Sequence, residues 1–102
     1  MRLTFLMTSL KKPKMSEISP KALIYPNVTL GEDVVVEEFS IIGLPFKGMK
    51  NIQTFIGSGS IIRAGTYIYA GNKIGKNFQT GNKANIRELN QIGDDVSIGT
   101  HS

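Results

Sequence analysis

The chain has a single histidine, His101, and histidine is the side chain whose ordinary pKa lies closest to neutrality. A general base of this kind can remove a proton from a hydroxyl or an ammonium group near pH 7. The alternative is a histidine tolerated in a left-handed turn, where histidine is enriched. The residue by itself favours neither hypothesis. Because one histidine is too few for a metal site within one chain, we expect no metal ion.

The stretch FQTGNKANIRELN at 78–90 gathers polar residues that could contact a ligand. The candidates for substrate binding are Thr80, Gly81, Asn82, Asn85, Arg87 and Glu88. Hydroxyl, amide, guanidinium and carboxylate groups at neighbouring positions suit a hydroxyl-rich or anionic ligand in a polar cleft. The alternative is a set of solvated corner residues, with the amides of Asn72 and Asn90 satisfied by a ladder inside the fold.

A repeat of six residues predicts the elements that position these side chains. Five anchors run at this spacing from Ile18 to Ile42, and eight more run from Ile56 to Ile98; all are aliphatic except Thr80. A helix needs apolar residues every three or four positions and a half-buried strand every two, so neither explains the spacing. The fourth residue of the unit is often Gly, Asn or Asp, which tolerate a left-handed backbone.

One unit is therefore a short strand followed by a corner, and the pair Pro26-Asn27 predicts a type II turn with Asn27 at positive φ. Three units close a triangle of eighteen residues, and such coils stack by parallel strand pairing about 4.8 Å apart. We predict an all-β fold, a parallel β-helix of triangular section. Residues eighteen apart then lie above one another, so that Gly65, Lys83 and His101 share one corner.

The repeat also predicts the domain organisation: an N-terminal extension or cap at 1–14 and a β-helix domain at 15–102. The repeat changes phase between Ile42 and Ile56, which indicates a protruding loop at about 43–55. The final unit stops inside its own corner, so we expect a covering partner chain or a longer protein of which this is the front part. Because thirteen anchors form a thin core, we also expect an oligomer of prisms side by side.

Composition limits the classes of partner. The net charge of +4 comes from Arg2, Lys11, Lys12 and Lys14, because removing these four cations leaves 4 − 4 = 0. A short basic tail without interleaved aromatic residues gives little support for nucleic-acid binding. The apolar run MRLTFLMTSL is too short to cross a bilayer. The absence of cysteine excludes disulfides and fits a reducing compartment, so we expect a cytoplasmic protein without a membrane partner.

Residues from about Met15 to Ser102 resemble the hexapeptide-repeat acyltransferases, most closely the sugar and nucleotide-sugar acetyltransferases of the left-handed β-helix class. The resemblance is carried by ISPKALIYPNVTLGEDVVVEEFSIIG and by IIRAGTYIYAGNKIGKNFQTGNKANIRELNQIGDDVSIGTHS. It implies a left-handed coil, acetyl-CoA as co-substrate and a homo-oligomer, most often a trimer. It also implies an acceptor hydroxyl or amine on a sugar or nucleotide-sugar, a histidine that takes its proton, and backbone amides that stabilise the oxyanion.

Carried over by residue, the resemblance implies a substrate or catalytic role near Thr80-Gly81-Asn82 and Arg87-Glu88. Members of the family often have histidine after the Thr-Gly pair, whereas this chain has Asn82, which leaves His101 as the candidate base. The alternative function is an inactive β-helix that serves as a scaffold or assembly domain. The γ-type carbonic anhydrases share the fold but need several histidines around a metal ion.

Overall fold

The computed structural model describes residues 16–47 and 52–102, and these residues form strands and turns without a helix. No helix in this part of the chain could therefore cross a membrane. The strands form three parallel sheets. The predicted N-terminal extension at 1–14 lies outside the described residues.

Each sheet collects every third strand of the chain. Sheet 1 contains β2 (Glu17–Ile18), β5 (Val35–Val36), β8 (Ile61–Ile62), β11 (Gln79–Thr80) and β14 (Ser97–Ile98). Sheet 2 contains β3 (Leu23–Ile24), β6 (Ile41–Leu44), β9 (Tyr67–Tyr69) and β12 (Asn85–Ile86). Sheet 3 contains β4 (Val28–Leu30), β7 (Thr54–Ile56), β10 (Lys73–Ile74) and β13 (Gln91–Ile92).

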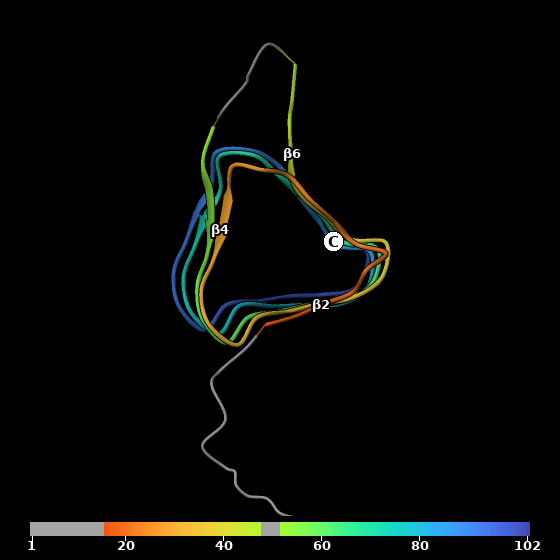
Figure 1. Ribbon diagram of the computed structural model, residues 1–102. Coiled ribbons are helices and arrows are strands. Elements are labelled where there is room, and N and C mark those ends of the chain that lie inside the picture. Colours follow the sequence, from red (N-terminus) through yellow and green to blue (C-terminus); the bar gives the residue numbers. More distant parts are fainter. Residues whose placement is uncertain (1–15, 48–51) are drawn as a thin grey trace, which may run out of the picture.

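The register of the sheets follows the predicted coil length. Lys73 pairs with Gln91, and Gln79 pairs with Ser97, in each case eighteen residues later. Seen along the stack, successive coils superpose as one three-sided outline (Figure 1). Three parallel sheets stacked in register are the arrangement expected of a parallel β-helix.

The anchors of the six-residue repeat line the interior. In sheet 1, Ile18 pairs with Val36, Val36 with Ile62, and Thr80 with Ile98, which gives one inward column. The fifth position of the unit also points inward, as predicted from strand alternation. Its buried members include small, β-branched, amide and aromatic side chains: Val34, Ser40, Ser60, Thr66, Asn72, Phe78 and Ala84.

Residues with positive φ mark the corners. The corner between sheets 3 and 1 turns at Asp33, Gly59, Asn77 and Asp95, as the repeat predicts. Asn27 does not have positive φ, so the predicted type II turn at this residue is wrong. Proline at the first central position suits a type I turn equally well, and that turn needs no left-handed residue.

One coil is longer than the others. Ile41 pairs with Tyr67, twenty-six residues later, so the chain has inserted 26 − 18 = 8 residues between β6 and β7. In the region of the predicted loop at about 43–55, β6 continues to Leu44 and β7 begins at Thr54, and residues 48–51 lie outside the described residues. Beyond the end of β6, the described chain leaves the coil at the corner between sheets 2 and 3 (Figure 1).

Candidate functional site

His101 lies at the corner between sheets 1 and 2, at the turn position that Phe39, Gly65 and Lys83 occupy in the preceding coils. All four residues have positive φ, from 58° at Lys83 to 73° at Gly65. The backbone N of Lys83 donates to the preceding coil at 2.9 Å, and the backbone N of His101 donates to Asn82 O at 2.9 Å. The predicted common corner is confirmed, and we call these four residues the His101 corner.

A depression of about 410 Å³ lies beside this corner on the outer surface of sheet 2, lined by Phe39, Gly65, Tyr67, Lys83, Ala84 and Asn85. Glycine at position 65 gives the Lys83 side chain room, because a Cβ there would lie only 3.1 Å from Lys83 Cγ. Phe39 and Tyr67 are 64% and 40% exposed, and their rings can stack against a planar or sugar ring. The ammonium group of Lys83 can attract an anionic substituent of the same ligand.

The imidazole of His101 is exposed, and no described residue forms a hydrogen bond with its ring. It is one coil away from Lys83 on the same corner, so both side chains can reach one ligand bound against this edge. A general base is usually oriented by a third group. If His101 acts as a base, the ligand or another chain supplies that orientation.

Thr80 and Gly81 occupy positions that the packing explains. The Thr80 side chain is 5% exposed, and its hydroxyl accepts from Arg63 N at 3.0 Å and lies 3.2 Å from Thr66 Oγ1. At Gly81, an added Cβ would lie 2.5 Å from Thr100 N of the next coil. The Thr80 hydroxyl therefore faces the interior and not the outer surface where a ligand would bind.

The amide of Asn72 bonds inside the fold, as the alternative to a binding role predicts. Asn72 is fully buried, and its Nδ2 donates to Tyr69 O and to Arg87 O, at 2.7 Å in both cases. Asn72 Oδ1 accepts from Asn90 N at 3.1 Å, and Asn90 Nδ2 donates to Arg87 O at 2.8 Å. The buried Asn72 amide is therefore satisfied within the chain, whereas Asn90 is exposed.

Arg87 and Glu88 lie at the other end of β12, at the corner between sheets 2 and 3. Arg87 Nε donates to Glu88 Oε1 at 2.8 Å, and the guanidinium stacks 4.3 Å from the centre of the Tyr69 ring. The hydrogen bond from Arg87 lowers the pKa of Glu88, and the same bond raises the pKa of Arg87. Both groups stay ionised at neutral pH.

The predicted substrate residues at the surface therefore fall into two groups within one chain. Asn82 and Asn85 are exposed beside the His101 corner, whereas Arg87 and Glu88 lie at the opposite edge of sheet 2. The strand β12 lies between these two corners, and the expectation that the residues share one polar cleft stays a prediction. Their individual roles in binding remain predictions.

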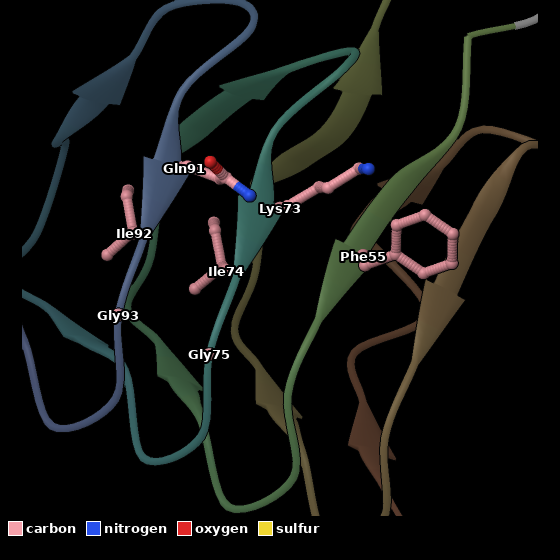
Figure 2. A pocket seen from close by; sticks show the side chains of 7 residues that line it. All are labelled: Phe55, Lys73, Ile74, Gly75, Gln91, Ile92 and Gly93. Carbon is pink, nitrogen blue, oxygen red and sulfur yellow. The ribbon is translucent and has the colours of Figure 1, made fainter.

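A second depression, of about 390 Å³, lies on the outer surface of sheet 3 and was not predicted from the sequence. Phe55, Lys73 and Gln91 line it from the successive strands β7, β10 and β13 (Figure 2). Ile74, Gly75, Ile92 and Gly93 complete its lining. It offers one aromatic ring, one ammonium group and one amide, and it lies on a different side of the coil from His101.

Within residues 16–47 and 52–102, no cluster of three His, Asp or Glu side chains could hold a metal ion. Comparisons of the chain with protein-family models, with curated proteins and with solved structures found no match. The assignment of a function therefore depends on the residues and their geometry.

Sequence reasoning missed Phe39, although its signal was present. Phe39 stands at the fourth position of the unit that begins at Val36, where a bulky apolar residue is unfavourable. The phase change between Ile42 and Ile56 hid its relation to Gly65, because the two residues are twenty-six apart and not eighteen.

Proposed function

We propose that this chain is an acetyltransferase, or the N-terminal part of one, that moves an acetyl group from acetyl-CoA to a hydroxyl or amine of a sugar or nucleotide-sugar. The proposal includes a left-handed coil and a homotrimer, as the resemblance to the hexapeptide-repeat acyltransferases implies. The observation that carries it is the His101 corner: an exposed imidazole one coil from Lys83, beside an aromatic depression.

The chemistry assigned to these residues is general-base catalysis. The acceptor's oxygen or nitrogen attacks the thioester carbonyl carbon, His101 takes its proton, and the carbon–sulfur bond breaks to release the CoA thiol. Lys83 offers a positive charge to the phosphate groups of the co-substrate or of a nucleotide-sugar. The rings of Phe39 and Tyr67 support the sugar or base by stacking.

The proposal is tested by measuring free CoA thiol as the purified chain is incubated with acetyl-CoA and a panel of amino sugars and nucleotide-sugars. We expect turnover, and we expect His101→Ala to lower kcat by about 100-fold or more while acetyl-CoA binding, measured by calorimetry, persists. Thr100→Ala, next to His101 and exposed, is the matched control and should keep its activity. No binding of acetyl-CoA to the unaltered chain would remove the proposal that this chain is itself the enzyme.

The second candidate is a non-catalytic scaffold, and a specific observation favours it. Asn82 stands where the family often has histidine, and no described residue orients the imidazole of His101. In that case the chain associates with itself but neither binds acetyl-CoA nor releases thiol. Calorimetry and a mass measurement on one preparation therefore separate the two functions.

A further inference from the structure

The depression of about 390 Å³ on the outer surface of sheet 3 is lined by side chains that the fold itself does not use. Phe55, Lys73 and Gln91 are paired neighbours on β7, β10 and β13, so they form one outward column with steps of about 4.8 Å. No hydrogen bond or ion pair joins the side chain of Lys73 or Gln91 to another described residue. Lys73 extends toward the ring of Phe55, and the amide of Gln91 points toward Lys73 (Figure 2).

A smaller depression of about 270 Å³ adjoins the first and shares Lys73 and Gln91 with it. Its remaining lining residues are Gly71, Leu89 and Asn90. Leu89 is 61% exposed and has a φ of 64°, a conformation that is unfavourable for leucine. A Cβ at Gly71 would lie 2.6 Å from Leu89 Cδ2, so the leucine side chain covers this glycine. Apolar side chains therefore lie near Lys73 both on the preceding strand, at Phe55, and in the following coil, at Leu89.

The charge at this surface favours an anionic ligand. Lys73 is the single charged residue among the described residues that line the two depressions. The carboxylate of Asp94 lies close to Gly75, outside the lining, and accepts from Lys76 N at 2.8 Å. One ammonium group without a partner balances one negative charge, and the amide of Gln91 offers a second donor to a two-oxygen group such as a carboxylate. Because Asp94 repels an anion, the carboxylate belongs at Lys73 and Gln91, away from Gly75.

We propose that this surface is a binding site for a small aromatic carboxylate. The carboxylate accepts from the ammonium of Lys73 and the amide of Gln91, and the aromatic ring packs against Phe55. The larger depression lies at the lower end of the range of about 300–1,000 Å³ that is usual for small-molecule sites. Sheet 3 is the side of the coil opposite the His101 corner, so this site does not depend on the proposed acetyl transfer.

The probe for the test is cinnamate, in which a short linker joins an aromatic ring to a carboxylate. Because the site is shallow and its ion pair is exposed to water, we expect a dissociation constant on the order of 1 mM. Backbone amide spectra of the full chain, recorded by NMR during a titration over roughly 0.1–20 mM, cover this range. We expect saturable shifts at Phe55, Lys73 and Gln91. Shifts that do not saturate, or that spread evenly over the surface, would overturn the proposal.

Two further ligands test the charge of the bound group. Cinnamamide has nearly the same shape as cinnamate without its charge, and it should bind about fivefold more weakly because the ion pair with Lys73 is lost. Phenyl phosphate carries a second negative charge for which the surface offers no second cation, so it should bind no more tightly than cinnamate. Equal binding of cinnamamide, or tighter binding of phenyl phosphate, would contradict the assignment of a carboxylate.

A pair of matched variants tests the residue that holds the carboxylate. Lys73→Gln should weaken cinnamate binding by about fivefold, whereas Lys76→Gln should leave it unchanged. Both lysines are exposed and lie in the same coil, and Lys76 lines neither depression, so the two variants lose the same charge at different places. Phe55→Leu should weaken binding by about threefold through loss of ring contact. The dispersion of the amide spectra shows that each variant is folded. Equal weakening in Lys73→Gln and Lys76→Gln would reduce the effect to net charge and overturn the site.

The His101 corner also combines aromatic rings with a lysine, so the test must separate the two surfaces. Lys83→Gln removes the cation of that corner and should leave cinnamate binding at sheet 3 unchanged. If Lys83→Gln abolished the binding and Lys73→Gln did not, the ligand would belong to the His101 corner and the proposal would be wrong.

Failure of this proposal is distinguishable from failure of the enzymatic one. Acetyl-CoA binding, measured by calorimetry, should be the same with and without saturating cinnamate. Cinnamate binding at sheet 3 by a chain that does not bind acetyl-CoA would support this site and remove the enzyme. Displacement of cinnamate from the amides of Phe55, Lys73 and Gln91 by acetyl-CoA would contradict a separate site for an aromatic carboxylate.

Discussion

Replacing Thr80 with valine tests whether this residue serves the fold or a ligand. Thr80 is the one anchor without an aliphatic side chain, and its hydroxyl lies in a chain of hydrogen bonds through the interior. Arg63 N donates to Thr80 Oγ1 at 3.0 Å, the hydroxyls of Thr80 and Thr66 are 3.2 Å apart, and Thr66 Oγ1 donates to Gly81 O at 3.2 Å. Since the Thr66 proton goes to Gly81 O, the Thr80 hydroxyl donates to Thr66.

The magnitude follows from these bonds. Valine has the shape of threonine but leaves Arg63 N without an acceptor, which costs about 1–3 kcal/mol, and it removes the donor to Thr66. The added methyl group returns about 0.8 kcal/mol through burial. We therefore expect Thr80→Val to lower the free energy of unfolding by about 1–2 kcal/mol, or Tm by roughly 5–15 °C.

Thermal and urea unfolding of Thr80→Val, Thr66→Val and the double variant measure the effect and the coupling between the two hydroxyls. Thr29→Val, an exposed threonine on an outward position of sheet 3, is the matched control and should change stability by less than about 0.5 kcal/mol. If Thr80→Val were as stable as the unaltered chain, the hydroxyl would not be engaged internally. Its place in the aliphatic column would then favour a role in ligand binding.

Two further substitutions and one titration test other parts of the structure. Gly57→Ala should destabilise the fold by about 1–3 kcal/mol in urea unfolding, because its Cβ would lie 2.5 Å from Gly75 C, whereas Gly93→Ala has no atom within 4 Å and should be tolerated. The carboxyl of Glu88, followed by NMR, should titrate below its unperturbed pKa of about 4.3, and Arg87→Gln should move it upward, because the hydrogen bond from Arg87 favours the charged form. A lowered pKa of Glu88 stabilises the fold at pH values above the pKa that Glu88 has in the unfolded chain, and this contribution is lost as the pH falls through the folded pKa. An unchanged titration of Glu88 in Arg87→Gln would contradict the hydrogen bond from Arg87 as the cause of the shift.

The fold was predictable because one short repeat fixes both the strand and the corner. Anchors six apart must face the interior, and three sides are the smallest closed outline that such units can make, so the column from Ile18 to Ile98 follows from spacing. The turn at Asn27 was not predictable, since proline before it suits two turn types. The length of the excursion was also hidden, because a gap of fourteen residues between anchors allows more than one division into coil and loop.

The candidate site was predictable only in part. The stacking of Gly65, Lys83 and His101 follows from a spacing of eighteen, and the structure confirms it. The grouping of Arg87 and Glu88 with Asn82 in one site stays a prediction, and the structure places these residues at the two ends of β12. In a coil of this kind, a separation of six residues spans a whole side and moves a side chain to the next corner.

Two corners with the same backbone conformation differ in what their side chains do. At the corner between sheets 3 and 1, the side chains support the next coil: Asn77 Nδ2 donates to Asp95 Oδ1 at 3.1 Å, and Lys76 N donates to Asp94 Oδ1 at 2.8 Å. Their residue types are explained by the turn and by these bonds. At the His101 corner, neither the Lys83 nor the His101 side chain forms a hydrogen bond with the described residues.

This contrast is the physical reason to place function at the His101 corner. Gly, Asn and Asp adopt a left-handed turn conformation with the least strain, and the corner between sheets 3 and 1 has these residues. Phenylalanine and lysine at the His101 corner carry a conformational cost, and histidine, although enriched in left-handed turns, forms no ring hydrogen bond with the described residues. Side chains that are costly where they stand and unused by their own fold are available to a ligand or to a second copy, and the outward surface of sheet 2 lies directly beside them.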